Sequence, residues 1–148
     1  MIGWLKGEIQ YRDQRRSRNL VLIACGGIGY EVHLVQRDWQ TMATGEPHEF
    51  WIHQVISADS LQLFGFLQVA ERDLFRELIQ VSGVGPQAGL SLLDACKPNE
   101  LVRALVHSDI KTLCRAKGVG KRTAERLALE LRTRLVDSDG SIDPDLNQ

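Results

Sequence analysis

Two short stretches of this chain have a residue pattern that suits the binding of a phosphate group. They read SGVGPQAG and KGVGKRTA, and their Gly-Val-Gly motifs start 35 residues apart. Glycine adopts backbone conformations that other residues avoid, and it leaves no side chain between the main chain and a ligand. We therefore expect two tight corners, named here the first corner (residues 82–87) and the second corner (residues 117–122). Their valines should point inward and their main-chain N–H groups outward.

Each corner is expected to open a helix, and the start of a helix attracts anions. The first N–H groups of a helix have no partner within it, and the helix dipole places positive charge beside them. A phosphate of a nucleic-acid backbone fits such a place, and contacts of this kind position a duplex without reading its sequence. The alternative is a pair of structural helical hairpins that bind no ligand.

Cationic residues surround the second corner only. Lys117 precedes it, and Lys121 and Arg122 open the helix that follows. Cations at a helix start oppose the dipole, so helix stability alone does not favour them, whereas a bound anion does. The first corner must rely on main-chain N–H groups and uncharged side chains. The predicted DNA contacts are Ser82, Gly83, Val84, Gly85 and Gln87 at the first corner, and Lys117, Gly118, Val119, Gly120, Lys121, Arg122 and Arg126 at the second.

The distribution of charge favours this interpretation. The whole chain has a net charge of only −1. Residues 101–135 alone hold nine lysines or arginines against three acidic residues. A charge run is usually a solvated helix face, but this one is centred on the second corner.

The sequence offers little support for other chemistry. The three cysteines lie far apart and the four histidines lack the spacing of metal ligands, so we expect no disulfide framework, metal site or cofactor. Outside the acidic end of the chain the carboxylates are scattered, which argues against a nuclease. No Walker lysine motif occurs, so we expect no ATP hydrolysis. Without a signal peptide or a membrane-length apolar run, a cytoplasmic protein is expected.

The residues before the corners have β character. Five short runs rich in β-branched and aromatic residues fill residues 1–66, with turn residues between them. The runs are residues 1–10, 19–25, 28–35, 49–56 and 61–66, and the stretch 36–47 has room for one short helix. Five strands in so short a segment predict a closed barrel, and an OB-type barrel fits best.

From residue 67 onward the apolar periodicity becomes helical. Five helices are predicted around the two corners, and either Ser108 or Asp109 is predicted to cap the helix before the second corner. The amphipathic stripe of the last helix consists of Ala124, Leu127, Ala128, Leu131 and Leu135. Residues 137–148 contain four aspartates, a glycine and a proline, which predicts a flexible acidic linker.

In order along residues 1–135, these motifs resemble the RuvA family of Holliday junction-binding subunits. The resemblance rests on MIGWLKGEI, GGIGYEVHL, LQLFGF, ERDLFRELIQVSGVGP and KGVGKRTAERLALEL. It implies a multidomain chain, β then α, with an OB-fold barrel over residues 1–66 and an all-α tandem helix-hairpin-helix domain over residues 67–136. It also implies a homotetramer that holds a four-way DNA junction open and square.

The same resemblance implies partners. Family members pass the junction to RuvB, a hexameric ATPase that drives branch migration in recombination and repair, and RuvC, a nuclease, can join them. The implied role is that of a non-catalytic DNA-binding subunit. Whether one tetramer or an octamer of two facing tetramers covers the junction stays open.

Three features differ from the family pattern. The family has a third small domain that contacts the motor, and we expect it to be absent after the linker. Gln87 stands where many relatives have a lysine, so the first corner should bind phosphate less strongly. The family's acidic pin, two acidic residues that repel phosphates near the crossover, falls on Ala58 and Asp59. Only Asp59 is acidic, and a plain turn role for it is the alternative.

Two other functions remain open from the residues alone. The chain could be the DNA clamp of a repair nuclease or glycosylase, or a protein-interaction module whose basic face meets an acidic partner. Cleavage of junction DNA with magnesium would favour the former, and failure to bind DNA at low salt would favour the latter.

Overall fold

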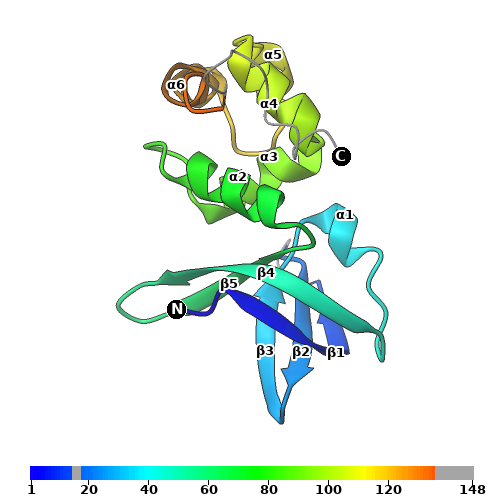
Figure 1. Ribbon diagram of the computed structural model, residues 1–148. Coiled ribbons are helices and arrows are strands. Elements are labelled where there is room, and N and C mark those ends of the chain that lie inside the picture. Colours follow the sequence, from blue (N-terminus) through cyan, green and yellow to red (C-terminus); the bar gives the residue numbers. More distant parts are fainter. Residues whose placement is uncertain (15–17, 136–148) are drawn as a thin grey trace. The chain divides into compact units, whose positions relative to one another are not determined.

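The computed structural model describes residues 1–14 and 18–135 (Figure 1). The chain divides into two compact units, of which the first is Met1–Arg72 and the second begins at Asp73. The predicted acidic linker, residues 137–148, lies outside the described residues. Within the described ranges, no helix is long and apolar enough to cross a membrane.

The first unit contains a closed five-stranded barrel, as predicted. Its strands are β1 (Trp4–Asp13), β2 (Leu20–Cys25), β3 (Ile28–His33), β4 (Pro47–Ile56) and β5 (Leu61–Phe66). They close in the order β1-β2-β3-β5-β4, with parallel pairing of β3 and β5 and antiparallel pairing elsewhere. Helix α1 (Gln36–Trp39) lies between β3 and β4, within the stretch that had room for one. Closure removes the free edges that an open sheet would present.

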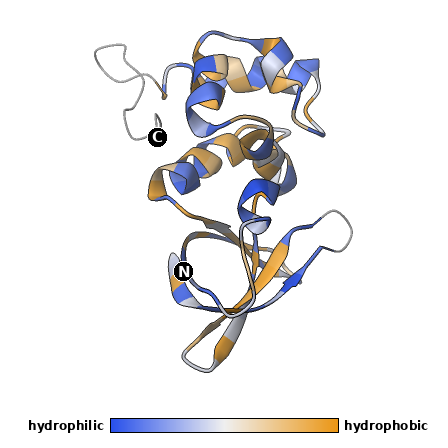
Figure 2. Cartoon of the chain, turned by 90° about the vertical axis from the view of Figure 1, so that its right-hand side faces the viewer, coloured by the Kyte–Doolittle hydropathy of each residue, from blue (hydrophilic) through white to orange (hydrophobic). Residues whose placement is uncertain are grey.

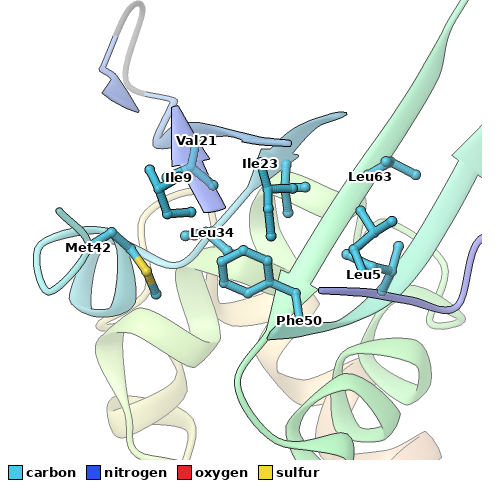
Figure 3. Packing of buried hydrophobic residues seen from close by; sticks show 10 residues of the cluster. Leu5, Ile9, Val21, Ile23, Leu34, Met42, Phe50 and Leu63 are labelled. Carbon is cyan, nitrogen blue, oxygen red and sulfur yellow. The ribbon is translucent and has the colours of Figure 1, made fainter. Parts of the chain in front are cut away.

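The barrel forms because alternate residues of its strands turn toward one apolar core. Along β1, Leu5 and Ile9 are buried whereas Lys6 and Glu8 between them are exposed. Phe50 of β4 is fully buried, and Figure 3 shows it among core side chains that converge from several strands. Each large apolar side chain buried in this way contributes about 1.5–3 kcal/mol.

The second unit is helical, and five helices lie around the two corners as predicted. They are α2 (Val69–Ile79), α3 (Pro86–Ala95), α4 (Pro98–Val106), α5 (Ile110–Leu113) and α6 (Lys121–Leu131). Asp109, not Ser108, caps α5: its carboxylate accepts a hydrogen bond from the Thr112 main-chain N–H at 3.2 Å. Ser108 instead takes a positive φ of 53° just before the cap.

The predicted stripe of α6 is the buried face of that helix. Ala124, Leu127, Ala128 and Leu131 are buried, and Leu135 beyond the helix is 8% exposed. Figure 2 shows hydrophobic and hydrophilic segments alternating along the helices, as amphipathic packing requires.

The compact units divide inside α2, later in the chain than the predicted barrel end at residue 66. Two contacts join the first turn of α2 to the barrel unit. Arg37 forms an ion pair with Glu71 at 3.3 Å, and the Arg72 guanidinium lies 5.7 Å from the centre of the Trp51 ring. A boundary read from the change of periodicity does not include such contacts, because they depend on side chains distant in sequence.

Candidate nucleic-acid interface

The two corners have almost the same backbone. Gly83 has a φ of 90° and Gly118 a φ of 86°, both in the region that favours glycine. Gly85 precedes α3 with φ −88° and ψ 178°, and Gly120 precedes α6 with φ −91° and ψ 177°. The sequence repeat is therefore a structural repeat, and its glycines are needed where the chain turns.

The valines of the corners point inward, as expected. Val84 is 5% exposed and Val119 is 6% exposed. Their N–H groups donate to Val81 and Ala116 at 3.0 and 3.1 Å, which closes each corner. The valines thus hold the shape of the corner, and their side chains are not available to a ligand.

All the other predicted contact residues are exposed. They are Ser82, Gly83, Gly85 and Gln87 at the first corner, and Lys117, Gly118, Gly120, Lys121, Arg122 and Arg126 at the second. Both helices that follow the corners begin without a side-chain cap. Helix α5 is different, since Asp109 caps it. The corners therefore present helix N–H groups to solvent where an anion can bind them.

Two arginines of the basic segment form ion pairs within the helical unit. Arg115 lies 2.8 Å from a carboxylate oxygen of Glu100, and Arg134 lies 3.1 Å from one of Glu77. Arg115 also donates to the carbonyl of Ala95, at the end of α3, at 3.0 Å. Exposed pairs of this kind contribute little to stability, about 0–1 kcal/mol, but they fix where these two charges lie.

The cations at the second corner are not neutralised in this way. The side chains of Lys117, Lys121 and Arg122 form no ion pair or hydrogen bond with any residue that the structure describes. Arg122 and Arg126 are four residues apart on α6, where like charges destabilise a helix. A bound anion would stabilise this arrangement of unpaired positive charges at an uncapped helix start.

Equivalent positions at the first corner carry no charge. A shift of 35 residues matches Ser82 with Lys117, Pro86 with Lys121, Gln87 with Arg122 and Ser91 with Arg126. One cation nevertheless reaches the first corner, because Arg126 donates from Nη1 to the carbonyl oxygen of Ser82 at 3.4 Å. Sequence reasoning assigned Arg126 to the second corner and missed this contact.

Comparison with known proteins extends over both units. Residues 1–65 match the RuvA N terminal domain, and residues 75–133 match a SAM-like helix-hairpin-helix tandem. A protein of Parasynechococcus marenigrum (strain WH8102), named Holliday junction branch migration complex subunit RuvA, is 78% identical over 148 residues, which are 100% of this chain and 72% of that protein. The chain belongs to the RuvA family. The predicted resemblance and fold class are thereby confirmed.

Further relatives are also named Holliday junction branch migration complex subunit RuvA. One from Synechococcus sp. (strain CC9605) is 53% identical over 144 residues, covering 97% of this chain and 67% of the relative. Another, from Synechococcus elongatus (strain ATCC 33912 / PCC 7942 / FACHB-805), is 47% identical over 138 residues, covering 93% and 67%. The chain thus spans about two thirds of the length of these curated relatives.

The two hairpins of this RuvA-family chain have nearly the same corner backbone, but the residues of the helices next to the two corners differ. Gly89 of α3 is buried against α2, and a Cβ added there would lie 3.0 Å from Cε2 of Phe75. The equivalent pair, 35 residues later, is Ala124 and Ile110. The first hairpin thus has phenylalanine and glycine where the second has isoleucine and alanine. Aligning the two repeats could have revealed this exchange, which sequence reasoning missed.

The β4–β5 turn carries the residues that the RuvA resemblance assigns to the acidic pin. The Ser57 N–H donates to the Ser60 carbonyl at 2.9 Å, and the two serine Oγ atoms lie 2.6 Å apart. Ser57 Oγ also donates to the Asp59 carboxylate at 3.4 Å. Asp59 and Ala58 are both exposed, so each chain presents one carboxylate on this turn. The contact with Ser57 also fits the alternative of a turn residue.

His33 of β3 is a buried histidine that packs within the barrel unit. His33 is 7% exposed and stacks on Phe64 at 4.9 Å between ring centres. Burial, aided by the charge of Arg18, lowers the pKa of His33 to about 4, so it is neutral at pH 7. Among the described residues, no group of three His, Cys, Asp or Glu side chains could hold a metal ion.

Proposed function

We propose that this chain is a structure-specific DNA-binding subunit that holds four-way (Holliday) junctions open and square as a homotetramer. It has no catalytic activity of its own on this proposal and acts in the cytoplasm. It presents the junction to RuvB, an ATPase that drives branch migration in recombination and repair, and RuvC nuclease can join the complex. The proposal rests chiefly on the second corner, where exposed N–H groups meet unpaired cations.

The geometry supports binding to the sugar–phosphate backbone rather than to bases. Helix N–H groups and flexible lysine or arginine side chains bind phosphate oxygens, which carry no sequence information. Two corners with the same backbone provide two such contacts in each chain. A fourfold assembly would repeat them on each arm of a junction, which is how a sequence-independent contact can become selective for DNA shape.

The names of the relatives support the same proposal. They are called Holliday junction branch migration complex subunits. This chain spans about two thirds of their length, and we propose its engagement with the motor from their names.

We also propose that Asp59 acts as a single-carboxylate pin near the crossover. Four chains around one junction would bring four carboxylates to its centre, and these would repel the phosphates of exchanging strands. Ala58 removes the second carboxylate of each chain, so strand separation should be weaker than with two acidic residues. The variant Ala58→Glu tests this on a junction that carries 2-aminopurine at the crossover. We expect the added carboxylate to increase base unstacking there, which raises the 2-aminopurine fluorescence. No change in fluorescence would favour the turn role.

The main experiment compares a four-way junction with a linear duplex built from the same arm sequences. We expect the chain to bind the junction at least about ten times more tightly, with an affinity that falls steeply as salt rises because counterions are released. Equal affinity for the two DNAs would overturn the proposal. Cleavage of the junction in magnesium would indicate a nuclease, and no binding even at low salt would indicate a protein-interaction module.

The mass of the complex provides a second readout. Sedimentation of the chain with and without the junction should show a tetramer on one DNA, or an octamer if two tetramers face each other. A monomer bound to the junction would contradict the homotetramer.

A further inference from the structure

Arg126 is the one cation among the described residues that the structure joins to the first corner. The guanidinium belongs to α6, in the second hairpin, and its contact to Ser82 spans 44 residues of sequence. The position equivalent to Arg126 in the first hairpin is Ser91, which carries no charge. The relation between the hairpins is therefore not symmetric. The second hairpin provides a cation to the first corner, but the first hairpin has no equivalent cation for the second corner.

The contact places the guanidinium beside the carbonyl oxygen of Ser82, an exposed residue. Ser82 immediately precedes Gly83, whose positive φ makes the turn. A carbonyl oxygen exposed there would repel a phosphate that approaches the N–H groups of the same corner. The hydrogen bond from Arg126 reduces this repulsion and adds a positive charge at the same place.

Arginine has the geometry to make both contacts at once. Its planar guanidinium has five N–H donors, and one of them serves Ser82. Within the described part of the chain, the Arg126 side chain makes no other hydrogen bond or ion pair. Its exposed position leaves the remaining donors directed at solvent, where an oxygen of a phosphate can accept them.

We propose that Arg126 is a phosphate-binding residue shared by the two hairpins, which supplies the first corner with the cation that Gln87 lacks. This inference rests on the proposed function, because it requires that both corners bind phosphate. It goes further by predicting an energetic link between α6 and a corner 44 residues earlier in the chain. The first corner should depend on Arg126 even though no charged residue lies within it.

A double-mutant cycle in the complete chain tests the link. The variants are Arg126→Ala, Gln87→Lys and the two combined, with Arg122→Ala and its combination with Gln87→Lys as the matched control. The Kd for a four-way junction and its salt dependence are measured for each variant. We expect Arg126→Ala to weaken binding by about 10-fold or more, because a charge-assisted contact is lost, and to lower the salt slope by about one.

The rescue by lysine distinguishes the link from a general effect of charge. Gln87→Lys should recover most of the loss caused by Arg126→Ala, because it returns a cation to the first corner. It should recover little of the loss caused by Arg122→Ala, which lies at the second corner. Equal improvement in both backgrounds would mean that the charges act independently and would overturn the inference.

Two additional measurements complete the test. Arg126→Lys keeps the charge but loses the planar fork, so we expect an intermediate Kd and no change in the urea midpoint of unfolding. A Kd equal to that of Arg126→Ala at an unchanged midpoint would contradict the supply of charge to the first corner, and wild-type binding by Arg126→Ala would overturn the link. If the wild-type chain itself fails to prefer the junction, the proposed function fails and the inference fails with it. Junction preference with additive variants rejects the inference alone.

Discussion

The first and second corners share nearly the same backbone conformation but differ in the charge of their exposed residues. Their glycines have φ values of 90° and 86°, and the valine between the glycines is buried in both. Lys117, Lys121 and Arg122 are cationic at the second corner, and the matching positions of the first are uncharged. The comparison shows that turn residues and buried packing set the corner's shape, whereas exposed residues can change its charge without changing that shape.

Removing the cations of the second corner should have the largest effect on binding. The double variant Lys121→Ala/Arg122→Ala should raise the Kd for a junction by about 100-fold, because two charge-assisted contacts are lost. The matched change at the first corner, Gln87→Ala, should raise it by less than about 3-fold. Fluorescence anisotropy at fixed salt measures both. A loss of similar size in the two variants would contradict the difference between the corners.

The same double variant should not destabilise the fold. Cations at a helix start oppose the dipole, so their removal should increase the free energy of unfolding by about 0.3–1 kcal/mol. Urea unfolding of the double variant serves as the control for the binding result. If the variant were less stable than wild type, its weaker binding could be explained by unfolding instead of by lost contacts.

Capping the helix after each corner should separate stability from binding. Gly120 has an extended ψ of 177°, and a Cβ added there meets nothing within 4 Å, so Gly120→Asp can imitate Asp109. The new carboxylate should add a few tenths of a kcal/mol, about the usual gain over glycine. It should also occupy the N–H groups and repel phosphate, raising the Kd by about 10-fold.

Gly85→Asp is the matched change at the first corner. We expect the same small gain in stability and a rise of about 3-fold in Kd, because fewer charges meet the phosphate there. Thermal unfolding and junction titration of both variants make the comparison. Tighter binding by either variant would show that the helix start does not contact DNA.

The packing difference beneath the corners gives a stability prediction. Gly89→Ala gains about 1 kcal/mol of helix propensity, but its Cβ would lie 3.0 Å from Cε2 of the buried Phe75. We expect the overpacking to outweigh the gain and to lower the free energy of unfolding by about 1 kcal/mol. Adding Phe75→Leu should restore part of it. The reverse change in the second hairpin, Ala124→Gly, should cost about 1 kcal/mol through helix propensity and lost contact. A Gly89→Ala variant more stable than wild type would show that Phe75 can move aside and would contradict the overpacking.

The smallest effect concerns the capped helix α5, which contrasts with the uncapped starts of α3 and α6. Hydrogen bonds from the Thr112 side chain and main chain lower the pKa of Asp109 below its usual value. A carboxyl with a lowered pKa in the folded state stabilises the fold above the unfolded value of about 3.9 and loses this contribution as pH falls through the folded value. Asp109→Asn should therefore lower the melting temperature at pH 7 and have little effect near pH 3.

The same variant should leave junction binding unchanged, because the Asp109 carboxylate accepts hydrogen bonds from Thr112 of α5 and belongs to neither corner. A change in Kd at an unchanged melting temperature would instead place Asp109 at the DNA surface.

Local patterns predicted much of this molecule. Alternating apolar residues indicated all five strands, and Gly-Val-Gly indicated both corners, because strand faces and tight turns are set by near neighbours. The choice between Ser108 and Asp109 as cap required the structure, since either side chain can accept the hydrogen bond. Apart from the buried Val84 and Val119, the predicted DNA contacts are exposed, and their binding role stays a prediction.

Contacts between distant residues could not be predicted in the same way. The bond from Arg126 to Ser82 depends on how the two hairpins pack, which no single window of sequence contains. The contact of Arg72 with Trp51 is of the same kind. A surface that joins the subunits of a tetramer would also combine residues distant in sequence, so no single window of sequence predicts it.

The closed barrel has a consequence for how the chain is made. Trp4 of β1 pairs with Trp51 of β4, and Val32 of β3 pairs with Leu63 of β5. Pairing of strands so far apart closes long loops, which slows folding. While the chain emerges from the ribosome, the first three strands have unpaired edges, with which strands of other nascent chains can pair. Only after residues 61–66 have emerged can the barrel close and end that risk.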